Sequence, residues 1–493
     1  MSAPWTSWLL SSCSLPRIRQ ATSPARPSAW TVDDPTGCRR AVEQEGGRRE
    51  TEDREVEQVS VGYIGLGAMG GSLARHLVAG HNLAVYDLNS ETLASFTELG
   101  ARVAASSRDL AATTDIVIIC LPRSSDVERL LFGENGIASA LSPGQLIIDQ
   151  TSGEPALTAK LAGRLAEGGV LYMDAPVSGG IPAAQNRSVT IIASGSEAAW
   201  TRGEVVLRAM STKVFRCGAR VGDGQAMKLV TNGIGACYRL ATLEMATLWC
   251  RFGLPLEQFV AALNASAGAN FTSRNMLIGL VEGRPTTNFS MPLMVKDLNG
   301  IIDVAARLGI PIPLTSTARS LMQGAIGLFG KEARLEDIVP FTEMLSSVGL
   351  RPAHRTEGMN LPSGLTPSEL STLLIEAIVA CNVIGVLECT RVGLGFGLEL
   401  EAIARVIDMG SAWSEVAQPL LSALGADGFD PGRYAAERMS LAATSSLARQ
   451  VGLPFIVASL AEYLWCNLEI SSEVGVGGAP TPYGTKFRSA IHG

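Results

Sequence analysis

The sequence predicts an α/β protein with a doubly wound parallel sheet, followed by an all-α region in two tandem copies. Between residue 59 and about residue 195, short apolar runs alternate with helical stretches, which is typical of parallel βαβ units. From about Gln225 the chain is helix after helix, with few strand-like runs. Several short motifs in this helical part recur at one offset, 387 − 243 = 144 residues, which indicates an internal duplication.

The strands of the predicted sheet are six short apolar runs. A glycine turn follows the first, and the helical pattern after this turn continues through Ala79. The expected strands cover residues 59–64, 83–86, 115–121, 145–148, 170–174 and 189–193. In the helical part, the Leu-Glu pair at 243–244 reappears at 387–388, and Phe-Gly-Leu at 252–254 reappears at 396–398.

Composition and charge exclude several classes of protein. A chain of 493 residues suggests about three domains at roughly 150 residues each. The net charge of −7 argues against a nucleic-acid-binding face, and no uncharged run reaches the roughly 18 apolar residues of a membrane span. Nine scattered cysteines without a CxxC pair are typical of reduced thiols, and four histidines show no metal-ligand spacing. We therefore expect a cytoplasmic protein without a metal site, a membrane partner or a nucleic-acid partner.

A glycine-rich turn follows the first strand and opens a helix. Its residues are Gly65, Leu66, Gly67, Ala68, Met69 and Gly70, and Asp87 ends the next strand 87 − 65 = 22 residues later. This context makes the GxGxxG pattern a dinucleotide-binding Rossmann fingerprint, with the pyrophosphate at the helix N-terminus. Asp87 would bind the adenosine ribose hydroxyls and repel a 2′-phosphate, and no arginine follows at Leu88 or Asn89. NAD is therefore expected as cofactor, and NADP is disfavoured.

Two further motifs place polar groups next to apolar elements. Ser178, Gly179 and Gly180 follow a strand, so their backbone N–H groups could bind an anion; an ordinary loop fits equally well. Lys228 and Asn232 are four residues apart and share one face of an apolar helix. A lysine in a desolvated site could exchange a proton with an alcohol or a carbonyl oxygen, and Asn232 could orient the substrate. A helix lysine, however, is more often a solvated surface group.

Four motifs in this order, GLGAMG, ICLP, DAPVSGG and GDGQAMKLVTN, resemble the β-hydroxyacid dehydrogenases, the family typified by 3-hydroxyisobutyrate dehydrogenase. The resemblance covers about residues 59–355. It implies hydride transfer between NAD and a small β-hydroxyacid or its semialdehyde. In this reaction Lys228 would be the acid/base and Asn232 would assist it, while the backbone amides of Ser178, Gly179 and Gly180 would bind the substrate carboxylate. It also implies further cofactor contacts, in addition to the glycine turn, Asp87 and Asn89, at Leu121, Pro122, Asp126, Thr151, Ser152 and Lys296.

The sequence departs from the family pattern at a few positions beside these motifs. Ala183 and Arg187 stand where the family usually has glycine, His76 stands for a common asparagine, and Thr231 stands for the first residue of a frequent Asn-Asn pair. Because Arg187 adds a positive charge after the DAPVSGG motif, we expect a substrate that is bulkier or more anionic than 3-hydroxyisobutyrate.

The chain is thus expected to have four segments: a disordered extension (1–57), an NAD-binding Rossmann domain (58–220), an all-α substrate domain (221–355) and its non-catalytic copy (356–493). The offset of 144 maps Lys228 to Thr372, Asn232 to Glu376 and Lys296 to the region of Met439. The copy therefore lacks the catalytic groups. We expect it to pack on the first helical domain as a partner subunit would, which leaves either an intrachain pseudo-dimer or a homo-oligomer.

Two other kinds of function remain open from the sequence. Within the enzymes, a 6-phosphogluconate dehydrogenase-like activity is the first alternative, although that group has histidine at the position of Thr231 and uses NADP; a semialdehyde reductase is the second. Outside the enzymes, a non-catalytic NAD-binding scaffold protein would account for the departures and for the duplicated domain without chemistry.

Overall fold

The computed structural model describes residues 59–351, 354 and 358–473, so the extension expected over 1–57 lies outside the described residues. Within them, nine strands form one mixed sheet with the order β3-β2-β1-β4-β5-β6-β8-β7, and β9 pairs with β8. The strands are β1 (Ser60–Ile64), β2 (Asn82–Tyr86), β3 (Arg102–Val103), β4 (Ile116–Ile119), β5 (Leu146–Asp149), β6 (Leu171–Asp174), β7 (Val177–Ser178), β8 (Thr190–Gly195) and β9 (Lys213–Gly218).

The first six strands are parallel, and the chain crosses from β3 at one edge back to β4 beside β1. All six expected strands are present. The run at 189–193, however, becomes β8, which is antiparallel to β6, so the sheet is not parallel throughout. The short strands β3 and β7 and the partly polar β9 have too few apolar residues for a sequence pattern to reveal them.

Helices cover both faces of the sheet, because successive strand residues point to opposite sides. On β1, Val61 and Tyr63 belong to one core and Ile64 to the other. The first core includes α1 (Ala68–Ala74), α2 (Ser90–Glu98) and α7 (Glu197–Met210), and a short α6 (Gly180–Gln185) contacts α1. The second core includes α3 (Ser107–Ala112), α4 (Ser124–Phe132) and α5 (Pro155–Ala166). This is the doubly wound arrangement that the sequence predicts.

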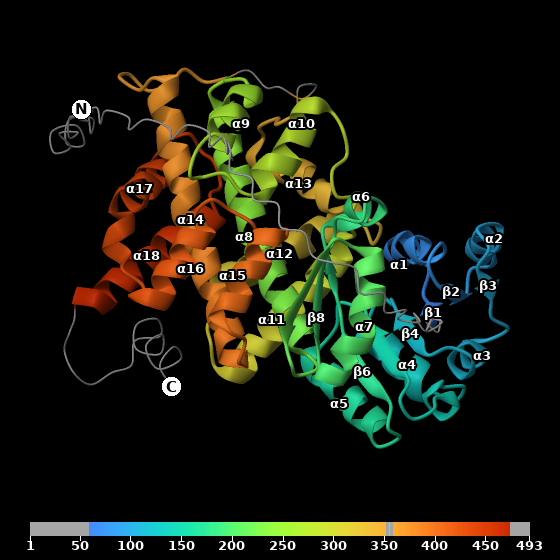
Figure 1. Ribbon diagram of the computed structural model, residues 1–493. Coiled ribbons are helices and arrows are strands. Elements are labelled where there is room, and N and C mark those ends of the chain that lie inside the picture. Colours follow the sequence, from blue (N-terminus) through green and yellow to red (C-terminus); the bar gives the residue numbers. More distant parts are fainter. Residues whose placement is uncertain (1–58, 352–353, 355–357, 474–493) are drawn as a thin grey trace, which may run out of the picture. The chain divides into compact units, whose positions relative to one another are not determined.

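Two sets of helices follow the sheet. The first contains α8 (Asp223–Arg251), α9 (Leu256–Asn264), α10 (Ile278–Glu282), α11 (Met291–Leu308), α12 (Pro313–Phe329) and α13 (Ile338–Ser346). The second contains α14 (Pro367–Phe396), α15 (Leu400–Met409), α16 (Ala417–Ala426), α17 (Ala435–Gln450) and α18 (Val457–Glu473), drawn in orange and red in Figure 1. Four starting residues share one offset, since 367 − 223, 400 − 256, 435 − 291 and 457 − 313 all equal 144.

The two helical sets share a single hydrophobic core, built around the long helices α8 and α14. Buried side chains of this core run from Ala226 on α8 to Trp465 on α18. By length and composition alone, α14 could cross a membrane, although its charged residues leave no long uncharged run. In the structure, 72% of its most apolar window is buried inside the protein. A central core helix of a soluble domain has the same composition, since it too is surrounded by apolar neighbours.

Candidate active site

The glycine turn after β1 has the geometry of a phosphate-binding loop. Gly65 has a φ of +95°, and a Cβ there would lie 2.3 Å from the carbonyl oxygen of Cys120. A Cβ on Gly70 would lie 2.1 Å from the carbonyl oxygen of Gly65, so neither position tolerates a side chain. Gly67, by contrast, is exposed, and nothing lies within 4 Å of where its Cβ would stand. The start of α1 therefore leaves room for a pyrophosphate against its first backbone N–H groups.

Asp87 ends β2 beside this turn. Its carboxylate accepts hydrogen bonds from the backbone N–H of Leu66 at 2.6 Å and of Asn89 at 2.8 Å. These bonds fix the carboxylate at the edge where a ribose would follow the pyrophosphate. The Asn89 side chain serves locally, because its Oδ1 accepts the N–H groups of residues 91 and 92 and caps α2. Leu88 between them is 92% exposed and offers no charge to a 2′-phosphate.

Lys296 on α11 joins the two loops that follow β4 and β5. Its ammonium donates to the carbonyl oxygen of Pro122 at 3.1 Å and to that of Ser152. The loops also contact each other, since the N–H of Leu121 donates to Thr151 Oγ1 at 3.1 Å. The structure thus brings together four predicted cofactor contacts and the lysine from the helical part. Because parallel strands end at one edge, these loops lie on the same side of the sheet as the glycine turn.

Asp174, the first residue of DAPVSGG, holds the start of α8 against the sheet. Its carboxylate accepts N–H bonds from Gly222 and Gln225, both at 2.8 Å, and a hydroxyl bond from Ser194 at 2.5 Å. Burial raises the pKa of Asp174 to about 7. The Gln225 amide in turn donates to the carbonyl oxygen of Thr151 at 2.6 Å. Both residues position α8, a role that the sequence did not reveal because their partners lie 20 to 74 residues away.

Lys228 begins a buried chain of polar groups. Its ammonium donates to Asn232 Oδ1 at 3.0 Å, and Asn232 Nδ2 donates to Asp297 Oδ2 at 2.6 Å. The three residues are 5%, 3% and 1% exposed. Burial lowers the pKa of Lys228 to about 8, although the Asp297 carboxylate opposes this and the Lys296 ammonium adds to it. A lysine of this kind can both accept and donate a proton near neutral pH.

Asp297 completes the chain and was missed in the sequence. Its second oxygen lies 3.2 Å from the ammonium of Lys296, so one carboxylate contacts both the Lys228–Asn232 pair and the lysine between the cofactor loops. One sequence signal could have revealed Asp297: it lies directly after Lys296, on the apolar stripe of a helix. An acid at such a position is buried and therefore needs a partner. In the second helical set, Thr372 at the position of Lys228 is exposed, and the offset of 144 places Ser440 at the position of Lys296, where its buried hydroxyl donates to Glu376 at 2.5 Å.

The predicted anion loop has the backbone conformation that its glycines allow. Gly179 and Gly180 have φ values of +136° and +81°, in the region that favours glycine. A Cβ on Gly180 would lie 3.2 Å from the carbonyl oxygen of Thr287. Ser178 is buried, and its hydroxyl lies 3.0 Å from that of Ser411, a residue of the second helical set. No sequence pattern indicated that this set reaches the loop.

Two residues that the sequence placed near the site have other partners. The Arg187 guanidinium donates to the carbonyl oxygen of Arg208 at the end of α7, at 3.1 Å, and its side chain is exposed. Its φ of +54° is in the left-handed region, which fits the glycine common there in relatives. The positive charge expected at the anion loop is therefore turned toward α7. Asp126 lies in the first turn of α4, 3.5 Å from Arg129, and no contact links it to the chain of Lys228.

The open sheet, the glycine turn and the buried lysine on the following helix define a nicotinamide-dependent oxidoreductase. Two family models match this part of the chain. Residues 60–218 match the NAD-binding domain of 6-phosphogluconate dehydrogenase, and residues 222–341 match the NAD-binding domain of NADP-dependent 3-hydroxyisobutyrate dehydrogenase. The protein thus uses a nicotinamide cofactor and acts on a small substrate.

Known proteins identify the family. The chain is 34% identical to L-threonate dehydrogenase of Cupriavidus necator over 54% of its own length and 90% of that enzyme. It is 35% identical to the mitochondrial 3-hydroxyisobutyrate dehydrogenase of Rattus norvegicus, over 54% of this chain and 82% of the rat enzyme. The chain belongs to the β-hydroxyacid dehydrogenase family, and it is an NAD(P)-dependent dehydrogenase of that type.

Two solved structures show how far the likeness extends. A 3-hydroxyisobutyrate dehydrogenase from Salmonella typhimurium is 32% identical, with a TM-score of 0.52, and covers 57% of this chain and 99% of its own. The 6-phosphogluconate dehydrogenase of Plasmodium falciparum is 16% identical, with a TM-score of 0.63, and covers 85% of this chain and 94% of its own. The second likeness concerns the fold alone, and it extends beyond the family models, which end at residue 341.

Proposed function

We propose that the protein reversibly oxidises a small β-hydroxyacid to its semialdehyde with NAD, and that Lys228 is the acid/base. The observation that carries this proposal is the buried chain of Lys228, Asn232 and Asp297 beside the loops held by Lys296. A buried ammonium is costly unless the protein uses it or pairs it. Here Lys228 is paired with the Asp297 carboxylate only indirectly, through the side-chain amide of Asn232, so the lysine keeps a proton that it can exchange.

In the proposed mechanism, the backbone N–H groups of 178–180 hold the substrate carboxylate, and Asn232 orients the hydroxyl toward Lys228. The neutral amine of Lys228 takes the hydroxyl proton during oxidation, and the ammonium returns it during reduction. The nicotinamide, when bound, accepts or returns the hydride. The cofactor would be held by the glycine turn and by residues 121–122 and 151–152. Lys296 would keep the loops after β4 and β5 together.

NAD rather than NADP is the proposed cofactor. Asp87 has a carboxylate fixed at the end of β2, where it would bind both ribose hydroxyls and repel a phosphate on one of them. Leu88 and Asn89 bring no positive charge to this position. This proposal is independent of the identity of the hydroxyacid.

The test is a reduction assay with NAD over a panel of β-hydroxyacids, including L-threonate and 3-hydroxyisobutyrate, with Lys228→Ala and Lys160→Ala measured beside the wild type. Lys160 is an exposed lysine on α5 and serves as the matched control. Lys228→Ala should lower kcat by about 10²- to 10⁴-fold with little change in NAD affinity. An unchanged kcat would refute the acid/base assignment. Tight NAD binding without turnover of any hydroxyacid would favour a non-catalytic binding protein.

We further propose that the two helical sets are tandem copies that form a pseudo-dimer within one chain. The common offset of 144 residues supports this, and so does a bridge between equivalent positions. Asn270 and Ser414, related by 414 − 270 = 144, pair with each other as an antiparallel bridge. On its two sides, the N–H of Phe271 donates to Trp413, and the N–H of Glu415 donates to Ala269. Such reciprocal contacts are what a two-fold axis between two copies produces.

A 6-phosphogluconate dehydrogenase-like activity is the second candidate, favoured by a fold likeness that includes the second helical set. Thr231 stands against it, because its hydroxyl is occupied by the backbone carbonyl of Lys228 at 3.0 Å and offers no titratable group. Including 6-phosphogluconate with NADP in the same panel decides between the two. A semialdehyde reductase is the same reaction run in reverse, and the direction with the higher kcat/KM would identify it.

A further inference from the structure

A loop of the second helical set, residues 410–415, lies against the proposed substrate site. The hydroxyl of Ser411 is 3.0 Å from that of Ser178 in the anion loop. Just before it, the carbonyl oxygen of Met409 accepts a hydrogen bond from Thr190 at 2.9 Å. Ser178 is 3% exposed, whereas Ser411 is partly exposed. The second set therefore contributes a side chain to the site besides any role in folding.

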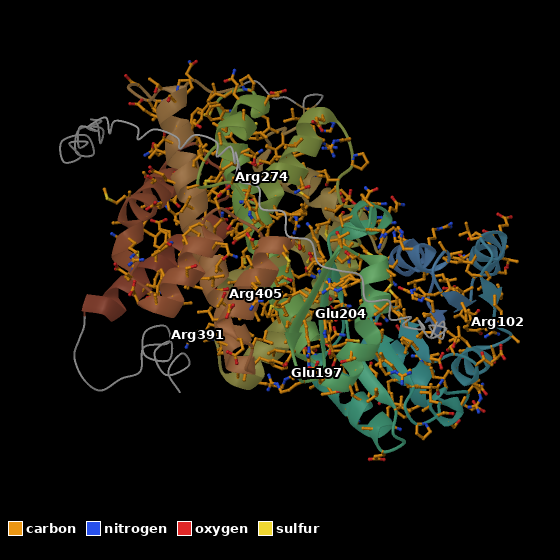
Figure 2. The ribbon with its side chains drawn as sticks, viewed as in Figure 1. Arg102, Glu197, Glu204, Arg274, Arg391 and Arg405 are labelled. Atoms are coloured by element: carbon orange, nitrogen blue, oxygen red, sulfur yellow. The ribbon has the colours of Figure 1, made fainter. Side chains whose placement is uncertain are left out.

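Contacts with the first helical set hold this loop in place. Arg274, labelled in Figure 2, stacks on the ring of Trp413 at 3.9 Å and pairs with Glu415 at 2.9 Å. On α8, the hydroxyl of Tyr238 lies 2.9 Å from that of Ser414. These contacts hold residues 413–415, and Thr190 and Ser178 hold the start of the segment at Met409 and Ser411, so the loop is a fixed wall of the site.

The face of α8 that meets the loop is the face that carries Lys228. Asn232, Gly235 and Arg239 follow on it at helical spacing, and a Cβ on Gly235 would lie 3.2 Å from the carbonyl oxygen of Ser411. Arg239 is three turns from Lys228, about 16 Å along the axis. The Lys228 ammonium is turned toward Asn232, while long side chains on a helix lean toward its N-terminus. Gly235 lies between the two residues on this face of the helix.

Arg239 is a buried cation without a hydrogen-bonded partner. The residue is 4% exposed, and neither its Nε nor its Nη1 has a hydrogen bond. Burial lowers the pKa of Arg239 to about 10, which leaves it charged at neutral pH, and the carboxylate of Glu336 acts on it in the opposite sense. Glu336 Oε2 also lacks a hydrogen-bond partner. A buried guanidinium with unused donors is expensive, so the free Nε and Nη1 of Arg239 are suited to a further anion in addition to the Glu336 carboxylate.

Glu336 also connects Arg239 with the anion loop. Its Oε1 accepts the N–H groups of Thr287 at 2.6 Å and of Asn288 at 3.0 Å, and the carbonyl oxygen of Thr287 approaches Gly180. Arg239 is thus linked through Glu336 to the segment that contains Thr287, and it lies one helical turn beyond Gly235, which approaches the 410–415 loop.

We propose that Arg239, one helical turn beyond the point where Ser411 approaches α8, binds a second anionic group at the end of the substrate distal to the reacting hydroxyl. The substrate would then be a hydroxyacid with two acid groups, the distal one a carboxylate or a phosphate. A guanidinium with free Nε and Nη donors can bind either of them in a bidentate manner. This inference rests on the proposed function, since it assumes that the first carboxylate lies at 178–180 and the hydroxyl at Lys228.

The test compares pairs of β-hydroxyacids with the same chain length, one ending in a methyl or hydroxymethyl group and the other in a carboxylate or a phosphate. The kcat/KM for each is measured with the wild type, Arg239→Gln, Ser411→Ala and Arg307→Gln, an exposed arginine at the end of α11. Arg239→Gln should lower the ratio of dianion to monoanion kcat/KM by about tenfold to hundredfold. Arg307→Gln should leave the ratio unchanged, and the carboxylate and phosphate arms show which group Arg239 prefers.

Folding does not obscure the result, because removal of an unpaired buried charge should keep or raise the melting temperature, and a melting curve of Arg239→Gln checks this. A wild-type preference for monoanions, or a ratio that Arg239→Gln does not change, overturns the inference while the proposed function stands. If the wild type oxidises no hydroxyacid of either kind, the proposed function fails and the inference with it. As a readout independent of turnover, malonate and inorganic phosphate should each raise the melting temperature of the NAD-saturated wild type more than that of Arg239→Gln.

Discussion

Glu244 and Glu388, 144 residues apart, each cap a helix of the opposite helical set. Glu244 on α8 accepts the N–H groups of residues 456–458 at 2.8–2.9 Å, where α18 begins. Glu388 on α14 accepts those of residues 314–315 at 2.9 and 3.1 Å, in the first turn of α12. Both carboxylates are buried. Because the caps are exchanged, each set satisfies helix N–H groups that the other set leaves open.

Loss of either cap should destabilise the whole helical region. Glu244→Ala or Glu388→Ala leaves two or three N–H groups at a buried helix start without an acceptor, at a cost of about 2–4 kcal/mol in the free energy of unfolding. Denaturant unfolding measures this. Glu369→Ala is the matched control, because Glu369 caps the exposed start of its own helix α14, and it should change stability far less. Equal effects of all three variants would contradict the role given to the exchanged caps.

Stability should fall as the pH rises toward neutrality. Burial raises the pKa of both Glu244 and Glu388 to about 7, against a usual value of 4.5. Between these values the folded protein retains protons that the unfolded chain has released, so the free energy of unfolding decreases from about pH 4.5 to pH 7. Unfolding curves at pH 5 and pH 7.5 measure the difference. Glu244→Gln, which cannot ionise, should show a smaller difference than the wild type, and an identical difference would contradict the assignment.

A chain that ends near residue 355 should not fold into an active enzyme. The truncation removes α14 to α18 and exposes the buried face of α8, which the shared core covers in the full chain. Several hundred Å² of apolar surface would then face water, which favours aggregation. Solubility, circular dichroism and NAD-dependent activity of the fragment test this. A soluble fragment with full activity would show that the second set is dispensable.

The rate of hydroxyacid oxidation should rise with pH through a pKa of about 8. Oxidation needs the neutral amine of Lys228, and reduction needs its ammonium, so the reverse rate should fall over the same range. Asp297→Asn keeps the hydrogen bond to Asn232 but removes the charge that raises the Lys228 pKa. This variant should move both profiles to lower pH. Profiles of kcat/KM from pH 6 to 10 measure the shift, and a profile at an unchanged position would exclude Lys228 as the titrating group.

Asp87→Asn should weaken the discrimination between the cofactors. The variant retains an oxygen that can accept an N–H bond from Leu66 or Asn89 but removes the charge that repels a 2′-phosphate. The ratio of kcat/KM for NADP to that for NAD should rise about tenfold. Asp109→Asn on α3, where the Asp109 side chain is 38% exposed, is the control for a general charge effect. A wild-type preference for NADP would overturn the proposed cofactor.

Local patterns predicted the sheet, the glycine turn and the helical region that follows them. The turn after β1 was predictable because a strand, three glycines and a helix start are consecutive in the chain, and their backbone requirements are local. The offset of 144 residues was predictable because equivalent core positions keep similar residues. The pairing of Lys228 with Asn232 followed from helical spacing alone.

What only the tertiary structure decided is which distant residues share a site. Asp297 joins Asn232 over 65 residues, and Ser411 joins Ser178 over 233. The charge expected from Arg187 turns toward α7, whereas Arg239, which looks like an ordinary helix residue in the sequence, is buried without a partner. Periodicity records which face of an element is apolar, but the partner of a buried charge depends on how whole helices pack. The sequence by itself determined the cofactor fold and the placement of Lys228 and Asn232 on one helix face, and the packing of the second helical set determined what surrounds them.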